Sequence, residues 1–188
     1  MKQEKVDRRV LYTKMFLRES LLALLESKPI EKITTAELCR HAGINRNTFY
    51  SHYRSPEELL NCMEEEVFQT IEASIARNTT VVDTLYAMRE NLFYRKILLY
   101  PNCSRRLWDK IQQRSVDRYQ KDLKKQEPHL PEETRNAVTL FIVQGSIAVV
   151  KDWLYSEMAV PPEELNQLLE TLAHQCIYAA KAVPRHPS

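Results

Sequence analysis

The scarcity of glycine is the feature that most restricts the fold of this chain. Only 2 of its 188 residues are glycine, whereas an average protein contains roughly 7%. Hairpins, dinucleotide-binding turns and phosphate-binding loops rely on glycine because they need tight turns and positive φ angles. Helices need neither, so we predict an all-α protein.

Length and composition narrow the class further. The hydrophobic content of 44% is enough for one ordinary domain, or for a small module joined to a larger one. The N-terminal segment lacks the apolar core of a signal peptide, and the longest apolar stretch, residues 138–150, is far shorter than the roughly 20 residues of a membrane span. The cysteines, which form no CxxC pair, are Cys39, Cys62, Cys103 and Cys176. Scattered thiols are typical of reduced proteins, so we predict a cytoplasmic location without membrane contact.

The net charge of +2 is unevenly distributed. Residues 1–55 carry 11 Lys and Arg against 6 Asp and Glu, a balance of +5. Residues 56–188 carry 16 against 19, a balance of −3. A basic N-terminal segment joined to a mildly acidic body indicates that the first part binds a polyanion.

Caps and helix breakers divide the first 60 residues. Pro29 ends a helix whose apolar stripe runs over 8–26. The capping box of Thr34 and Glu37 begins a second helix, which Gly43 ends after Ala42. Asn45 is the N-cap of a third helix, and Ser55-Pro56-Glu57-Glu58 begins a fourth. These signals predict helices over 8–26, 35–42 and 46–53 and a fourth helix from Pro56. Longer helices are predicted over 56–77, 80–100, 104–126, 132–157 and 162–182.

Two short helices joined by a glycine-containing turn have the sequence form of a helix-turn-helix. Residues Phe49 and Tyr53 are four apart, so they share one face of the third helix and fill the space beneath it. The opposite face carries hydrogen-bond donors and no carboxylate: Arg46, Asn47, Tyr50 and Arg54. Arginine suits guanine, asparagine suits adenine, and hydroxyls suit phosphate oxygens. This face is predicted to enter the major groove of DNA.

The run from Thr13 to Leu60 resembles the DNA-binding domain of TetR/AcrR-type transcriptional regulators. The matching motifs are Ile33-Thr34-Thr35, Ala42-Gly43-Ile44, Thr48-Phe49-Tyr50-Ser51-His52-Tyr53 and Ser55-Pro56-Glu57-Glu58-Leu59-Leu60. The resemblance implies a TetR-like fold, in which an N-terminal three-helix helix-turn-helix domain precedes a larger helical dimerisation and ligand domain. We expect these domains at residues 1–60 and 61–188.

The resemblance also implies a set of DNA-binding residues. Carried over position by position, they are Thr35, Arg46, Asn47, Thr48, Tyr50 and His52. Within this set Arg46 and Asn47 are the expected base readers, and the other four are expected phosphate contacts. The departure from the family pattern is Pro56, which replaces a lysine that often opens the fourth helix. The N–H groups of that helix end can still face a phosphate.

Within the family, residues 30–34 and 45–50 look more like the branch that includes regulators of dihydroxyacetone kinase genes. Some members of that branch act as coactivators, so the resemblance leaves open whether binding represses or activates. Two features favour a homodimer over a purely internal core: the wide apolar stripe over 165–180, and the small residues Gly145 and Ala148 on the preceding helix.

Other classes of function are disfavoured. No Gly-x-Ser-x-Gly, Walker or HExxH motif occurs, so we predict no enzyme and no cofactor. The spacing of Cys39, His41 and His52 matches no standard zinc pattern, so we predict no metal. A helical adaptor that binds only proteins is the stronger rival, but it leaves the acid-free face unexplained. We therefore predict a homodimeric repressor on a palindromic operator, modulated by a small molecule whose binding residues are unknown. The alternative is a coactivator or adaptor that acts through a partner protein.

Overall fold

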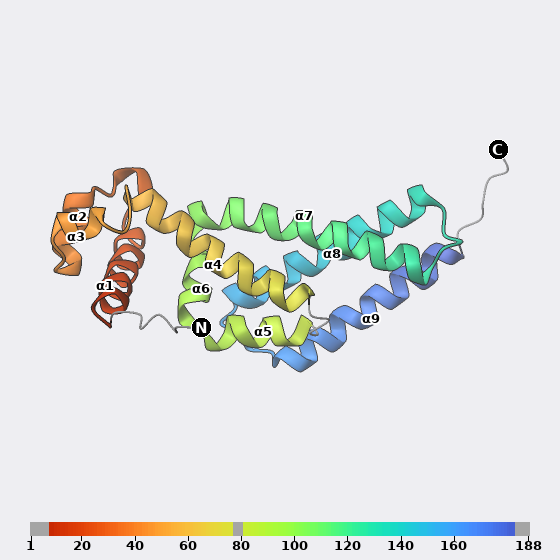
Figure 1. Cartoon of the computed structure of the whole chain (residues 1–188). Helices are drawn as coiled ribbons and strands as arrows, with labels where there is room; N and C mark the ends of the chain where they lie inside the picture. The colour runs from red at the N-terminus through yellow and green to blue at the C-terminus, as the bar shows by residue number, and fades with distance from the viewer. Residues whose placement is uncertain (1–7, 77–80, 183–188) are drawn as a thin grey trace, which may run out of the picture. The chain divides into compact units, whose positions relative to one another are not determined.

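The computed structural model describes residues 8–76 and 81–182, and every regular element in these ranges is helical (Figure 1). The all-α prediction is confirmed. The outermost residues of the two predicted domains, 1–7 and 183–188, lie outside the described residues. The described chain divides into two compact units. The first unit holds residues 8–67 with 96–107, and the second holds 68–76, 81–95 and 108–182.

The first unit is built around a small helical bundle. Its elements are α1 (Arg8–Leu25), a short 3-10 turn (Ile30–Lys32), α2 (Thr35–Ala42), α3 (Arg46–Tyr50) and the beginning of α4 (Pro56–Ala76). Helix α2 packs against both α1 and α3, which lie together at the red and orange end of the chain (Figure 1). The completely buried side chains include Leu17, Leu21, Leu38, Phe49, Leu59 and Met63. This apolar centre holds the short helices, which are too short to be stable alone.

Helix α3 ends at Tyr50, three residues before the predicted end at Tyr53. The N–H of Tyr53 still donates to the carbonyl of Phe49 at 2.9 Å, so its side chain keeps a place in the core. The next N–H, that of Arg54, donates instead to the carboxylate of Glu58. The backbone is thereby directed into α4, and the helical pattern of α3 cannot continue.

The second unit contains longer helices. They are α5 (Val81–Glu90), α6 (Leu92–Leu99), α7 (Pro101–Gln126), α8 (Glu132–Tyr155) and α9 (Pro162–Lys181), with the last residues of α6 and the first of α7 belonging to the first unit. Helix α9 packs against both α5 and α8. The indole N–H of Trp153 donates to the carbonyl of Val160 at 2.7 Å and so closes the turn between α8 and α9.

Two predicted boundaries in this region are wrong. The single helix predicted over 80–100 is divided at Asn91, whose Oδ1 accepts the N–H of Phe93 at 3.0 Å and of Tyr94 at 3.3 Å. This side chain caps α6 and starts a new helix. Helix α7 begins at Pro101 rather than at 104, because proline is well suited to the first helical position, where no N–H is needed.

Helix α8 is the one described helix that is long and apolar enough to span a membrane, with a mean hydropathy of 1.5 over an 18-residue window. Its apolar character extends beyond the interrupted stretch 138–150 noted in the sequence. One such helix is weak evidence for a membrane protein, because core helices of other proteins share the property. Only 33% of that window is buried within the chain, so much of its apolar surface is left exposed.

Candidate nucleic-acid interface

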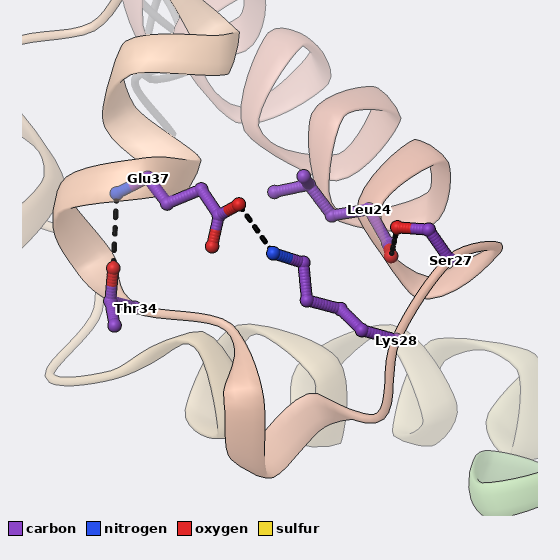
Figure 2. A network of polar contacts seen from close by, with 5 residues as sticks. All are labelled: Leu24, Ser27, Lys28, Thr34 and Glu37. Atoms are coloured by element: carbon purple, nitrogen blue, oxygen red, sulfur yellow. Dashed lines mark hydrogen bonds and ion pairs between the residues drawn. The ribbon is translucent and has the colours of Figure 1, made fainter.

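The start of α2 is held by a short network of polar contacts (Figure 2). The hydroxyl of Thr34 accepts the N–H of Glu37 at 3.2 Å, as the capping box predicts. The carboxylate of Glu37 does not return to the cap but accepts a hydrogen bond from Nζ of Lys28 at 2.5 Å. This bond lowers the pKa of Glu37 below its ordinary value, against the opposing effect of partial burial. The acid at the start of α2 is therefore ionised and paired.

The turn between α2 and α3 depends on Gly43. Its φ of 66° lies in the left-handed region, which other residues adopt only at a cost. The following N–H, of Ile44, donates back to the carbonyl of Cys39 at 2.9 Å and closes the end of α2. The side chain of Asn45 then accepts the N–H of Asn47 at 2.8 Å and caps α3. Both predicted caps are confirmed, so local contacts determine the direction in which α3 leaves the turn.

Aromatic side chains from α3 and from the turn that follows it pack together beneath α3. The ring of Phe49 is fully buried, with its centroid 5.9 Å from that of Tyr53 and 5.6 Å from that of Tyr50. Burial raises the pKa of the Tyr53 phenol, and the nearby Arg18 partly offsets this. The predicted core positions Phe49 and Tyr53 are confirmed. Their packing fixes the rotation of α3 about its own axis and therefore which residues face outward.

The outer face of α3 presents most of the predicted DNA-binding set. The exposed members are Arg46, Asn47, Thr48 and Tyr50. Thr35 is partly buried at the first position of α2, and His52 is partly buried in the turn that follows α3. The five residues of α3 include no acid. The structure therefore gathers four of the six residues on one short helix and places the other two on its immediate neighbours.

The start of α4 departs from the simplest expectation for a phosphate contact. The hydroxyl of Ser55 accepts the N–H of Glu58 at 3.2 Å, which confirms the predicted cap. However, Glu57 and Glu58 both lie in the first turn, and the carboxylate of Glu58 is drawn back to the N–H of Arg54. Two carboxylates at a helix N-terminus oppose a further anion there. Replacement of the family lysine by Pro56 is therefore not compensated by this helix end.

Two features bear on other ligands. Among residues 8–76 and 81–182, no three His, Cys, Asp or Glu side chains gather closely enough to hold a metal ion. The second unit has a hollow of about 340 Å³, lined by Glu72, Arg114, Asp117, Arg118, Lys121, Asp122 and Lys125. Several of these charges are already paired, as in the contact between Arg114 and Glu72 at 2.6 Å. Every residue that lines the hollow is charged, whereas pockets that hold small molecules are lined mainly by hydrophobic and aromatic side chains.

A helix-turn-helix with a donor-rich, acid-free outer face, followed by a larger helical unit, defines the class of DNA-binding transcriptional regulators. Residues 17–63 match the family described as bacterial regulatory proteins, tetR family, and residues 65–175 match a transcriptional regulator C-terminal region. The chain belongs to the TetR family of transcriptional regulators.

Individual relatives agree with this assignment. An uncharacterised HTH-type transcriptional regulator, YxbF of Bacillus subtilis, is 40% identical over 63 residues, which are 33% of this chain and 17% of that protein. The match thus covers only a small part of the relative's length. A TetR transcriptional regulator from Streptococcus agalactiae has a similar fold, with 23% identity, a TM-score of 0.65 and coverage of 89% of this chain and 96% of the other.

Two further solved structures share the fold at lower identity. NalD, the secondary repressor of the MexAB-OprM multidrug efflux pump in Pseudomonas aeruginosa, is 14% identical, with a TM-score of 0.62 and coverage of 89% and 97%. The dihydroxyacetone kinase operon activator DhaS is 18% identical, with a TM-score of 0.54 and coverage of 89% and 97%. DhaS is one neighbour among several, so these likenesses show the fold and not the branch.

Proposed function

We propose that the chain is a homodimeric repressor that binds a palindromic operator through residues 1–60 and is regulated through residues 61–188. The observation that carries the proposal is the exposed, acid-free outer face of α3 over a fully buried aromatic core. A rigid helix of this kind can enter a major groove with its donors already oriented, so that little entropy is lost on binding.

Within this interface, Arg46 and Asn47 read bases, because both are exposed in the first turn of α3 and both carry paired hydrogen-bonding groups. The hydroxyls of Thr35, Thr48 and Tyr50 and the ring of His52 contact phosphates. These contacts fix the register of the protein on the duplex but carry no sequence information.

Exposed apolar faces on α8 and α9 support the homodimer. On α8, one face at helical spacing exposes Ala137, Phe141, Ala148 and Tyr155. On α9, Leu168 and Leu172 are each about half exposed. These two helices pack on each other, so a second copy would bury both faces in a shared four-helix arrangement. This also accounts for the apolar character of α8 without a membrane, in line with a cytoplasmic protein.

Regulation by a small molecule is proposed through α4, because this single helix contributes residues to both units. An effector that displaced α4 would shift the DNA-binding residues and change the affinity for the operator. NalD, which shares the fold, is described as a repressor. DhaS, which shares it too, is described as an operon activator. Activation is therefore the second candidate, and we propose that it would act through a partner protein.

The test is selection of duplexes from a random pool by the full chain at two salt concentrations. We expect a palindrome to be enriched. Replacement of Arg46 or Asn47 by alanine should then weaken binding to it by about 1–3 kcal/mol and relax the preference at one base pair. The exposed lysine Lys125, in the second unit, supplies a control: Lys125→Ala should change neither quantity. Enrichment unchanged by both α3 variants would contradict the site, and failure to bind any duplex at low salt would favour the adaptor.

A further inference from the structure

Lys28 connects the start of α2, where the phosphate contact is proposed, to a segment distant in sequence. Its Nζ donates to the carboxylate of Glu37 at 2.5 Å, and both side chains are partly buried, 29% and 27% exposed. Its backbone N–H donates to the carbonyl of Leu24 at 3.2 Å, which ties it to the end of α1. The carbonyl of Lys28 accepts the hydroxyl of Tyr100 at 3.3 Å.

The segment 96–100 makes a second contact with the same turn. Nζ of Lys96 lies 2.9 Å from the carboxylate of Glu26. Of the three residues between these contacts, Ile97 and Leu98 are almost completely buried, so the segment is anchored by its apolar side chains. All of these residues belong to the first unit. The position of Lys28 is therefore determined from both sides, by α1 and by residues 96–100.

The position of Glu37 makes this pairing important for DNA binding. Glu37 is the third residue of α2, in the same first turn as Thr35, the proposed phosphate contact. An ionised carboxylate at this end repels a phosphate, unless a cation neutralises it and holds it aside. A lysine that is itself fixed in space supplies both effects, and it does so without contacting DNA.

We infer that Lys28 is a positioning residue for the phosphate contact of α2, that it acts through Glu37, and that residues 96–100 hold it in place. The inference rests on the proposed phosphate contact at Thr35. It assigns a role in DNA affinity to residues outside the helix-turn-helix motif, at the junction of α6 and α7. Displacement of that junction would change the affinity by releasing Lys28 and leaving Glu37 unpaired.

The test is a set of binding measurements on full-length variants. The probe is a fluorescein-labelled random-sequence duplex of about 30 base pairs, because phosphate contacts do not depend on sequence. We expect Lys28→Met to weaken binding about two- to fivefold per half-site. Glu37→Gln keeps the size and the hydrogen-bonding capacity of the side chain without the charge and should bind at least as tightly as the wild type. The double variant should regain the affinity of Glu37→Gln alone.

The binding affinity of Tyr100→Phe distinguishes a loss of Lys28 positioning from a general loss of stability. We expect it to weaken binding less than Lys28→Met, and to have no effect in the Glu37→Gln background. A destabilised fold would weaken binding in both backgrounds. Circular dichroism at the assay temperature tests whether each variant is folded. If Tyr100→Phe is not folded, Lys96→Gln is measured in its place.

Each outcome separates the inference from the function it rests on. If Lys28→Met stays weak in the Glu37→Gln background, Lys28 contacts DNA directly and the inference is wrong. If Thr35→Ala weakens binding but Lys28→Met does not, the inference alone is wrong. If the wild type binds the duplex and neither Thr35→Ala nor Lys28→Met changes the affinity, the proposed phosphate contact at α2 is wrong as well.

Discussion

The exposed ring of Phe141 on α8 provides a quantitative test of dimerisation. Within one chain 71% of this residue is exposed, although it lies on a helix whose other face is buried. Burial of a phenylalanine side chain contributes roughly 1.5–3 kcal/mol. In a two-fold symmetric dimer the residue is buried twice, so Phe141→Ala should cost roughly 3–6 kcal/mol of association free energy. The dissociation constant should rise about 10²- to 10⁴-fold.

Sedimentation velocity over a dilution series measures this constant directly. Tyr12 supplies a matched control, because it is an aromatic residue on α1 of the first unit that is likewise more than half exposed. Tyr12→Ala should leave the dissociation constant unchanged. Because Phe141 makes little contact within its own chain, the variant should remain helical by circular dichroism. An unaltered dissociation constant for a folded Phe141→Ala protein would refute the assignment of this face to the dimer.

Three further predictions concern the helix-turn-helix. Phe49→Ala should lower the free energy of unfolding by about 3–5 kcal/mol, because the ring is fully buried, and urea denaturation would show a correspondingly lower midpoint. Gly43→Ala should cost about 1 kcal/mol through its φ of 66° alone, because no atom lies within 4 Å of the added methyl; a neutral result in thermal unfolding would contradict that backbone argument. The third prediction concerns pH. Pairing with Lys28 lowers the pKa of Glu37, so the stabilisation that the pair gives the fold is complete above the ordinary pKa of 4.5 and is lost as the pH falls through the lowered pKa. Acid titration of stability should therefore show a steeper decline for the wild type than for Glu37→Gln, and parallel curves would exclude the pairing with Lys28.

Local signals predicted most of the helix-turn-helix. Thr34, Asn45 and Ser55 each accept the backbone N–H that their positions in the sequence predict. Gly43 adopts the left-handed conformation expected at the end of α2. The burial of Phe49 followed from helical periodicity. Each of these outcomes depends on groups only two to four residues apart, which is why the chain order was sufficient to find them.

The missed features involve competition between local and distant partners. The capping box suggested that Glu37 would return to its own cap, but Lys28 takes the carboxylate instead. The division of the helix predicted over 80–100 was signalled by Asn91, yet asparagine also occurs inside helices, so the residue alone did not decide between a cap and a continuous helix. Periodicity likewise described α9 as one wide apolar stripe. It did not show that Leu165 and Leu169 are buried while Leu168 and Leu172 stay exposed.

The sequence by itself determined the all-α class, the places where most helices begin, and three of the four residues predicted on the outer face of α3; the fourth, Arg54, lies beyond the end of that helix. These properties follow from backbone conformation and from hydrogen bonds within one turn. The tertiary structure decided which partner holds Glu37, that residues 96–100 join the first unit, and which apolar residues of α8 and α9 stay exposed. Such outcomes depend on contacts between residues far apart along the chain. The free energy of those contacts is set by packing and desolvation after the helices have come together.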